Sequence, residues 1–417
     1  MKYLKTAIFL ALVTLLLVLS FSACAPAPPE EGAPPAPEAP DTIKFGWAIS
    51  LTGDFAFGAE TEQCRAFRMW FADTNEKGGI YLSEYGKRIP IEVITYDDKS
   101  DPATCVQYAE KLILEDKVDL LLPSWGSTMT FAEAPIANKY GYPYVTPSCS
   151  VEEMRQMRIE QPLPYYFGAL NMLREQAPSL AELLAGCGVE TAAIIHHDVL
   201  HGIEWATYVA PALEDVGIDV TLLEQFPMGT SDLSPILKRI KTLNPDALLV
   251  FGYPPEEFLA LEQTITVDFN PKVYFGSVGP AFPSFRDSYG ANVVEGIMHS
   301  GAWNGKISPE AAEFVDRFAA EGYGEPDYWC TGIAYGVCQV YEQALEKAGT
   351  IDREAIKNVL ETETFHTVVG EVKFGEDGHN LYFPGDIGQW QSGMSEVIAP
   401  EGKRTAEPIY PKPAWPK

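Results

Sequence analysis

Short apolar runs alternate with amphipathic stretches along most of the chain. Residues 118–122 and 144–146 are apolar runs of the kind that forms a strand buried on both faces. Between residues 59 and 75, apolar side chains such as Phe67, Trp70 and Phe71 recur at helical spacing. Buried strands that alternate with helices predict an α/β fold, in which an open parallel sheet is covered by helices on both faces.

The expected elements form three blocks. The first has strands over residues 43–49, 89–96, 118–122 and 144–146, and helices over 59–75, from Asp101 onward and over 131–140. The second starts near Gly168 and has strands over 191–196, 220–225, 247–251 and 272–275. The third starts near Ile297, with helices over 309–321 and 331–347 and strands over 368–374 and 386–390. Because residues 244–250 echo residues 116–122, we expect two lobes of similar architecture.

Two clusters of hydroxyl side chains follow neighbouring strands of the first block. One is the turn of residues 123–128, with Trp125, Ser127 and Thr128, and the other is the turn of residues 147–150, with Ser148 and Ser150. Parallel strands end at the same edge of a sheet, where ligands of such folds bind, so the clusters should be neighbours. Hydroxyls and free N–H groups at a helix N-terminus receive anionic groups. The pattern therefore predicts a binding site, although such residues also cap helices and turns.

The N-terminus has the pattern of an export signal. Lys2 and Lys5 precede an apolar stretch over residues 7–19, and small residues lead to Cys24. We interpret residues 1–24 as a lipoprotein signal peptide, with Cys24 as the lipidated residue. A retained signal anchor is the alternative, but the stretch is short for a span of about 20 residues. Residues 25–41, rich in Pro and Ala, are expected to form an extended tether.

Charge and motifs narrow the function. The chain has 58 acidic and 30 basic residues, a net charge of −28, which argues against a nucleic-acid partner. We find no GxSxG, HExxH, P-loop or GxGxxG motif, so we predict neither an enzyme nor a cofactor, although a pair of catalytic carboxylates is not excluded by sequence. His196, His197 and Asp198 lie near His201, but adjacent strand residues point to opposite faces, and we predict no metal site. The six cysteines after Cys24 leave disulfides and free thiols both open.

Several short segments, taken in order, carry a resemblance. They are residues 46–53 (GWAISLTG) with 75–80 (NEKGGI), residues 96–102 (YDDKSDP), and residues 141–143 (GYP) leading to 146–148 (TPS). The set resembles the Leu/Ile/Val-type substrate-binding proteins of ABC transporters, which have the type I periplasmic binding fold. The resemblance implies two Rossmann-like lobes with open parallel sheets, joined by three crossovers near Phe167, Ile297 and Thr367. Lobe 1 would comprise residues 42–167 and 297–367, and lobe 2 residues 168–296 and 368–417.

The resemblance also implies site residues. By position, Ser127 or Thr128 and Ser148 with Ser150 match the groups that grip an amino-acid ligand. Aromatic positions of the family fall at Phe57 in the first lobe and at His201 and Tyr253 in the second. The acidic residue that pairs with a ligand ammonium should fall near Val278 and is missing, unless Asp198 or Glu256 substitutes. An aromatic or aliphatic acid, or an amide, therefore fits the aromatic surroundings, including Trp125, at least as well as an α-amino acid.

These observations predict an extracytoplasmic lipoprotein that captures a small carboxylate- or amide-bearing ligand by lobe closure. The ligand would pass to an ABC permease in the membrane, and the protein would act as a monomer on the periplasmic or outer face of the cell membrane. Two alternatives remain: a sensor that reports the ligand to a signalling partner, and a surface hydrolase on a similar frame.

Overall fold

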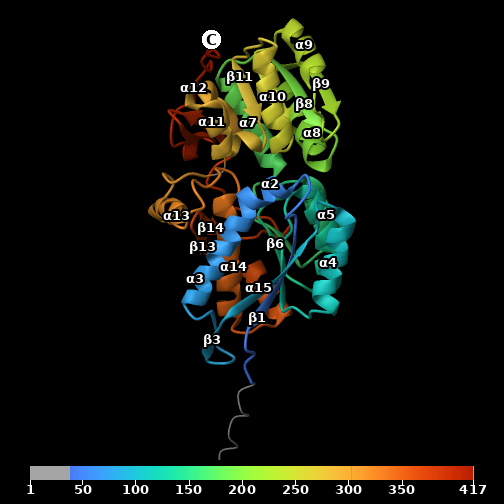
Figure 1. Cartoon of the computed structure of the whole chain (residues 1–417), viewed down its shortest axis with the longest axis vertical. Coiled ribbons are helices and arrows are strands. Elements are labelled where there is room, and N and C mark those ends of the chain that lie inside the picture. The colour runs from blue at the N-terminus through green and yellow to red at the C-terminus, as the bar shows by residue number, and fades with distance from the viewer. Residues whose placement is uncertain (1–37, 302, 417) are drawn as a thin grey trace, which may run out of the picture. The chain divides into compact units, whose positions relative to one another are not determined.

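The structure is a computed structural model that describes residues 38–301 and 303–416 (Figure 1). The predicted signal peptide, the lipidation site at Cys24 and most of the tether lie outside the described residues. From Ala39 onward the chain forms one compact unit. No helix in the described part is both long enough and apolar enough to cross a membrane.

The first lobe is built around β1 (Ile43–Ile49), whose residues are nearly all buried. This strand pairs in parallel with β4 (Ile91–Asp97) on one side and β5 (Leu120–Leu122) on the other. A second parallel pair joins β6 (Tyr144–Thr146) to β7 (Tyr166–Gly168), and β2 (Ile80–Leu82) forms a hairpin with β3 (Lys87–Ile89). The helices of this lobe are α3 (Arg65–Glu76), α4 (Pro102–Leu114), α5 (Ser127–Lys139), α6 (Glu152–Glu160), α14 (Thr331–Ala348) and α15 (Arg353–Thr362). In Figure 1, blue α3 lies beside orange α14 on one side of β1, and α4 lies beside α5 on the other.

The second lobe contains a seven-stranded sheet in the order β16-β15-β12-β11-β10-β8-β9. Its strands are β8 (Thr191–His197), β9 (Asp219–Phe226), β10 (Ala247–Phe251), β11 (Val273–Gly276), β12 (Met298–Ser300), β15 (Ile387–Gln391) and β16 (Met394–Ala399). The pairs from β9 to β12 are parallel, and the two C-terminal strands are antiparallel. Its helices are α7 (Leu173–Gly186), α8 (Leu200–Asp215), α9 (Ser234–Leu243), α10 (Pro254–Thr266), α11 (Pro283–Tyr289) and α12 (Ala291–Val294).

Both faces of the larger sheet are covered, as the uninterrupted apolar runs predicted. Ile194 and Leu249 belong to the core on one face, and their neighbours Ile195 and Leu248 belong to the core on the other. Because successive strand residues point to opposite faces, only a strand buried on both sides can be apolar throughout. The α/β class is therefore confirmed, although the parallel strands of the first lobe form two separate small sheets and not one open sheet.

The first helix of the chain differs from the prediction in a way that matters for the site. It begins three residues earlier than residue 59, as α2 (Ala56–Ala59), and a π-helical turn over Glu60–Cys64 separates α2 from α3. Glu62 and Gln63 are buried within this turn. The carbonyl of Thr61 accepts a hydrogen bond from the Thr331 hydroxyl at 3.2 Å, which ties this turn to the start of α14.

Two segments near the expected crossovers pair differently from the predicted lobes. The strand β12 (Met298–Ser300) pairs with β11 and β15 in the larger sheet, so the chain leaves that sheet after Ser300, close to the crossover expected near Ile297. The strand β13 (Phe365–Thr367) packs against α14 in the core of the first lobe. Its hairpin partner β14 (Gly370–Val372), which follows the boundary expected at Thr367, adds Val372 to the same core. The short helix α13 (Pro309–Ala320) joins the same core through Phe314. The lobe boundaries as drawn from the resemblance stay a prediction.

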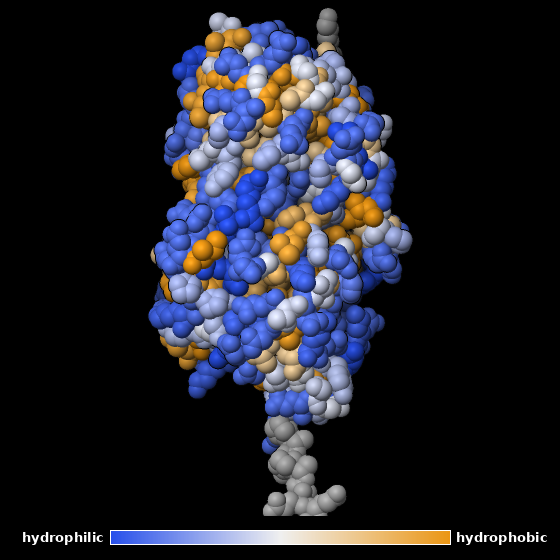
Figure 2. Space-filling view, turned by 180° about the vertical axis from the view of Figure 1, so that it is seen from behind, coloured by the Kyte–Doolittle hydropathy of each residue, from blue (hydrophilic) through white to orange (hydrophobic). Residues whose placement is uncertain are grey.

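The surface of the molecule is mainly hydrophilic on the face seen from behind. Figure 2 shows the face opposite to that of Figure 1, where hydrophilic side chains predominate and apolar ones form small separate patches.

The six cysteines in the described part of the chain are free thiols, and all but Cys187 are buried. The structure therefore favours the free-thiol alternative for these six residues.

Candidate ligand-binding site

The two hydroxyl clusters lie next to each other, as predicted. The backbone N–H of Gly126 donates to the Ser148 hydroxyl at 3.0 Å, and that hydroxyl donates to Gln63 Oε1 at 3.3 Å. Gly126 has a φ of 84°, a left-handed value that glycine adopts without strain, and α5 begins at the next residue. Ser148 therefore joins the two turns, and its hydroxyl is already engaged inside the protein.

Other hydroxyls of the clusters have no such partner. Ser150 is 1% exposed, and neither its hydroxyl nor that of Thr128 makes a hydrogen bond within the described residues. The Ser127 side chain is also buried, at the first position of α5, where it lies against the Cys149 thiol. A buried polar group without a partner costs free energy, so unpaired hydroxyls at one place indicate a site for a further molecule.

Aromatic rings from the two lobes meet above the start of α5. The Tyr253 ring, at the N-terminus of α10, lies 5.2 Å from the Trp125 ring and 5.3 Å from the Phe55 ring. A Cβ atom at Gly126 would lie 3.3 Å from the Tyr253 hydroxyl, which itself has no hydrogen-bond partner in the described part of the chain. Burial raises the pKa of Tyr253, and the nearby Thr128 hydroxyl and Ser127 amide act in the opposite direction. Tyr253 thus closes the first-lobe site from the second lobe.

His201 forms the next part of this wall. Its ring stacks on Tyr253 at 5.2 Å, with 16° between the planes, and its Nε2 lies 3.1 Å from the Ser277 hydroxyl. Burial lowers the pKa of His201 to about 3, so the imidazole is neutral at physiological pH. The Trp329 ring lies 6.2 Å from His201, and its indole N–H is buried without a partner among the described residues.

Phe57 does not belong to this buried group. It is 46% exposed, and its ring lies 5.7 Å from Phe282 and 6.4 Å from Phe258, both on second-lobe helices or their edges. The structure therefore places Phe57 at the edge of the interface between the lobes, apart from Trp125 and Tyr253.

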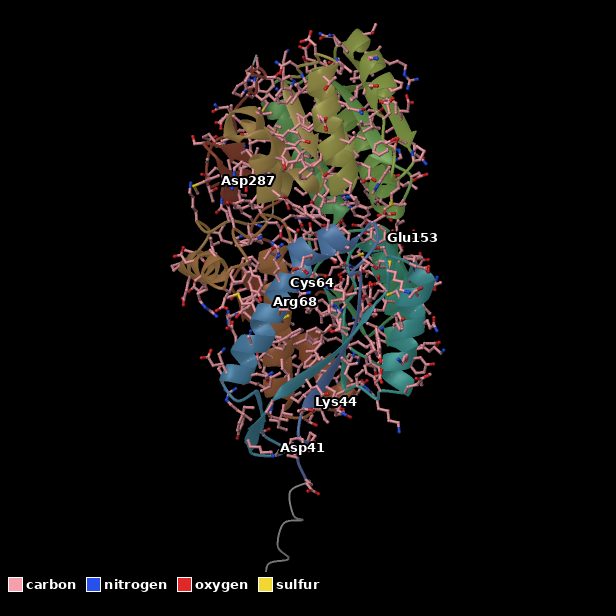
Figure 3. All side chains as sticks on the ribbon, in the orientation of Figure 1. Asp41, Lys44, Cys64, Arg68, Glu153 and Asp287 are labelled. Carbon is pink, nitrogen blue, oxygen red and sulfur yellow. The ribbon has the colours of Figure 1, made fainter. Side chains whose placement is uncertain are left out.

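Glu62 was missed by the sequence analysis. Its side chain is 1% exposed, and its Oε2 accepts a hydrogen bond from the Trp125 indole at 2.6 Å. Its Oε1 has no partner among the described residues. Figure 3 labels Cys64, two residues further along the same blue helix. The sequence does contain one signal for the burial of Glu62. Glu62 lies three residues after Ala59 and four before Ala66, and this spacing places it on the apolar side of a helix that otherwise buries small and aromatic residues.

The loop around Val278 is held by a different carboxylate. Glu257, fully buried on α10, accepts hydrogen bonds from the backbone N–H groups of Ser277 at 2.6 Å and Val278 at 2.9 Å, and also from Gly279. Burial raises the pKa of Glu257 to about 8, while these hydrogen bonds act in the opposite direction. The position expected to supply an acid is therefore a backbone turn, bound by an acid from the neighbouring helix.

Asp198 and Glu256, the two possible substitutes, are also engaged with the backbone. Asp198 accepts from the N–H of Met228 at 2.8 Å, and Glu256 accepts from the N–H of Gly229 at 2.8 Å. Both carboxylates thus hold the loop that follows β9. His196 and His197 likewise bond to nearby backbone groups, and the described residues contain no group of three or more His, Cys, Asp or Glu placed to hold a metal ion.

A second polar contact joins the lobes at α6. Glu204, on α8, accepts hydrogen bonds from the backbone N–H of Glu152 at 2.7 Å and of Glu153 at 3.1 Å. Figure 3 labels Glu153 at the end of the first lobe that faces the second. Burial raises the pKa of Glu204 to about 7, with the neighbouring Glu152 and Glu153 carboxylates acting in the same direction. The carboxylate of one lobe thereby caps a helix of the other.

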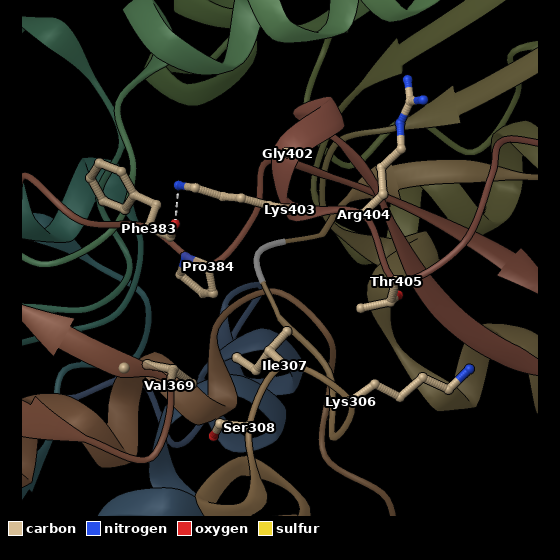
Figure 4. Close-up of a pocket in the computed structure, with 11 residues that line it drawn as sticks. Lys306, Ile307, Ser308, Val369, Phe383, Pro384, Gly402, Lys403, Arg404 and Thr405 are labelled. Atoms are coloured by element: carbon tan, nitrogen blue, oxygen red, sulfur yellow. Dashed lines mark hydrogen bonds between the residues drawn. The ribbon is translucent and has the colours of Figure 1, made fainter.

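A surface cavity of about 410 Å³ lies elsewhere, between the β12–α13 connection and the C-terminal segment (Figure 4). It is lined by Lys306, Lys403 and Arg404 among others. Each of these cations already has a partner: Glu396 for Lys306, the Phe383 carbonyl for Lys403, and Glu407 for Arg404. Unlike the interface between the lobes, this cavity offers no uncommitted charge.

The comparison with known families decides where the chain belongs. A family model described as periplasmic binding protein matches residues 42–395. The chain belongs to the periplasmic binding protein family. The Leucine-, isoleucine-, valine-, threonine-, and alanine-binding protein of Pseudomonas aeruginosa is 25% identical over 360 residues, which cover 86% of this chain and 92% of that protein.

Solved structures show the same fold. The branched-chain amino acid transporter substrate binding protein of Streptococcus pneumoniae, in complex with isoleucine, has a TM-score of 0.73 at 20% identity and covers 89% of this chain and all of its own. A solute binding protein of an ABC transporter from R. palustris, in complex with benzoate, has a TM-score of 0.73 at 17% identity and covers 89% of this chain and 97% of its own. The type I periplasmic binding fold and the resemblance to Leu/Ile/Val-type proteins are thus confirmed. This periplasmic binding protein is a solute-binding protein and not an enzyme.

Proposed function

We propose that the protein is the extracytoplasmic solute-binding component of an ABC importer and that it captures one small ligand between its lobes. One observation carries the proposal. Buried hydroxyls that lack a partner within the described residues come from both lobes, and those of Thr128 and Tyr253 lie beside each other where Tyr253 meets Trp125. Ser150 and Thr128 supply hydroxyls from the first lobe, and Tyr253 supplies one from the second.

The chemistry of these groups sets the ligand class. The start of α5, with its backbone N–H groups and hydroxyls, suits a carboxylate or amide oxygen. The rings of Trp125, Tyr253 and the neutral His201 suit an apolar or aromatic body. Relatives of the same fold are solved with isoleucine and with benzoate, so both amino acids and aromatic acids are reasonable ligands to test.

The proposed mechanism is lobe closure. The first lobe binds the polar end of the ligand, and Tyr253 with His201 closes over it from the second lobe. The closed form then presents surfaces of both lobes to the permease. Lipid attachment at Cys24 would hold a monomer at the membrane through the tether of residues 25–41. Mass spectrometry of the N-terminal peptide, isolated from membranes, tests the lipid.

Ligand binding is tested with the purified protein by thermal-shift screening of amino acids, aromatic acids and amides, followed by calorimetry of the hits. For a hit, Ser150→Ala should weaken binding about tenfold, the effect of losing one hydrogen bond of about 1.4 kcal/mol. Ser179→Ala is the matched control, because Ser179, on α7 of the second lobe, also has a buried hydroxyl without a hydrogen-bond partner among the described residues. Equal loss in both variants, or no hit in the screen, would count against the proposal.

A further inference from the structure

Glu62 is a buried carboxylate whose environment is incomplete. It lies in the π-helical turn between α2 and α3, at the interface with the second lobe, and one of its two oxygens has a single donor, the Trp125 indole. The other oxygen has none within the described residues. An ionised carboxylate accepts several hydrogen bonds, so Glu62 is far from satisfied by the protein alone.

Two neighbouring buried carboxylates, in contrast to Glu62, each accept several hydrogen bonds from the protein. Asp327 accepts from the backbone N–H groups of Trp329, Cys330 and Thr331 at 2.7–2.8 Å. Glu257 accepts from four backbone N–H groups around residues 252 and 277–279. Both therefore have structural roles as caps of turns or helices. Glu62 instead keeps one oxygen without a donor among the described residues, as Asp98, Glu133, Glu175 and Glu256 do, and of these five only Glu62 is bonded to the Trp125 indole.

The charges around Glu62 are of one sign. Burial raises its pKa well above the usual value, and the carboxylates of Asp327 and Glu257 raise it further. The Trp125 indole acts in the opposite direction, and no Lys or Arg is among the groups that shift this pKa. The other titratable neighbours are the Tyr253 phenol and the Cys330 thiol, whose own pKa values the Glu62 charge raises. A cation placed here would favour the ionised form of this carboxyl, which burial and the neighbouring carboxylates disfavour.

The rings beside Glu62 suit such a cation. Trp125 donates to the carboxylate through its indole N–H, and the Tyr253 ring lies 5.2 Å from that of Trp125. Aromatic faces attract ammonium and related groups, Trp most strongly. His201, stacked on Tyr253, is neutral and adds no repulsion.

We propose that Glu62 binds a positively charged nitrogen group of the ligand, an ammonium or amidinium. The inference rests on the proposed function and makes the ligand a zwitterion or a cation, held at its charged nitrogen by Glu62 and at its polar end by the hydroxyls at the start of α5. The carboxylate for the ligand cation thus comes from the first lobe, from a helix, and not from the loop at Val278.

The test uses pairs of probes that differ only in the nitrogen. L-leucine is compared with 4-methylpentanoate, and L-phenylalanine with 3-phenylpropanoate, by calorimetry on the full chain and on Glu62→Gln. In the wild type the amino member should bind at least tenfold more tightly than its partner. In Glu62→Gln this ratio should fall to about one, while binding of the acid without nitrogen stays the same or improves.

Glu133→Gln is the matched control. Glu133 is another buried glutamate of the first lobe, with a pKa raised to about 8 by burial, but its carboxylate accepts from Tyr144 and the Ser124 N–H beneath the site. This variant should retain the wild-type ratio. If the acids without nitrogen bind the wild type as tightly as the amino acids, or if Glu62→Gln leaves the ratio unchanged, the inference is wrong while the proposed function stands. If none of the four probes binds, the inference is wrong, and the proposed function is decided by the wider screen.

Proton release gives a second readout that a purely structural role would not change. Burial and like charges raise the pKa of the Glu62 carboxyl, and a bound cation lowers it again, so binding should release protons at pH values between the pKa of the free form and that of the bound form. The heat of L-leucine or L-phenylalanine binding should then differ between phosphate and Tris buffers for the wild type and not for Glu62→Gln. A buffer dependence that is the same in both proteins contradicts the role of Glu62.

Discussion

The Tyr253 ring of the second lobe lies 5.2 Å from the Trp125 ring of the first. Both rings are almost fully buried, although each belongs to a turn before a helix. The lobes therefore touch through the residues that were expected to surround the ligand. Changes at this contact should alter both closure and binding.

Tyr253 should separate the role of the ring from that of the hydroxyl. In Tyr253→Phe the ring remains, so we expect little change in thermal stability and a loss of affinity of up to about tenfold for a ligand that uses the hydroxyl. In Tyr253→Ala the contacts with Trp125, Phe55 and His201 are lost, and affinity should fall by much more. Calorimetry with the best ligand of the screen measures both, and identical affinities for the two variants would show that neither group faces the ligand.

Gly58 should be intolerant of a methyl group. A Cβ atom there would lie 2.3 Å from the Trp125 ring, which its bond to Glu62 holds in place. Gly58→Ala should lower stability by about 1–3 kcal/mol and weaken ligand binding, because Trp125 must move. Gly186→Ala is the control, since Gly186 ends α7 and a Cβ atom there meets nothing within 4 Å. Thermal melting of the two variants measures the difference, and equal melting temperatures would contradict the prediction.

Glu204 should make closure of the unliganded protein depend on pH. In the structure burial raises its pKa to about 7, and in an open form the carboxyl would regain water and a pKa near 4.5. The closed form then binds a proton more tightly, so closure should be favoured at pH 5 and weakened as the pH rises through 7. Small-angle scattering of the unliganded protein should show a radius of gyration that grows between pH 5 and 8.

The increase in the radius of gyration between pH 5 and 8 should be smaller in Glu204→Gln. Glu214→Gln is the control, because Glu214 is exposed on the same helix. If the radius of gyration changes equally with pH in Glu204→Gln and in the wild type, Glu204 does not cause the pH dependence of closure.

Stability should also decrease in alkaline solution. Burial raises the pKa of Glu133 and of Glu257 to about 8, above the value of 4.5 expected in the unfolded chain. The stability that comes from their protonation is complete below pH 4.5 and is lost as the pH rises through 8. Burial lowers the pKa of His201 to about 3 and of His299 to about 4, so below pH 6.5 these residues oppose folding. The contributions of these four groups oppose each other between about pH 4.5 and 6.5, so we expect the melting temperature to fall from about pH 6.5 upward.

Glu133→Gln should reduce the loss of stability between pH 6.5 and 8 by about 1–2 kcal/mol, since one pKa unit corresponds to about 1.4 kcal/mol. Denaturant unfolding at the two pH values measures this loss. The same loss in the variant and the wild type would mean that Glu133 is already ionised at pH 6.5.

The sequence determined the order of helices and strands, because apolar periodicity records which positions face the interior. It also predicted that the turns at Gly126 and Ser148 would meet, and they do, although β5 and β6 belong to different sheets. Only the tertiary structure decided which polar groups remain without a partner. Ser148 bonds to Gln63 and Gly126, whereas Ser150 keeps its hydroxyl without a bond in the described part of the chain.

Glu62 shows the physical reason most clearly. A glutamate in a helix of an acidic protein is usually exposed, and its burial here results from a π-helical turn and from contact with Trp125, Asp327 and the second lobe. These partners are distant in sequence, and the hydrogen bonds and charges that a residue meets depend on segments that only folding brings together. Local pattern fixes the face on which a side chain lies, and the tertiary structure fixes what it meets there.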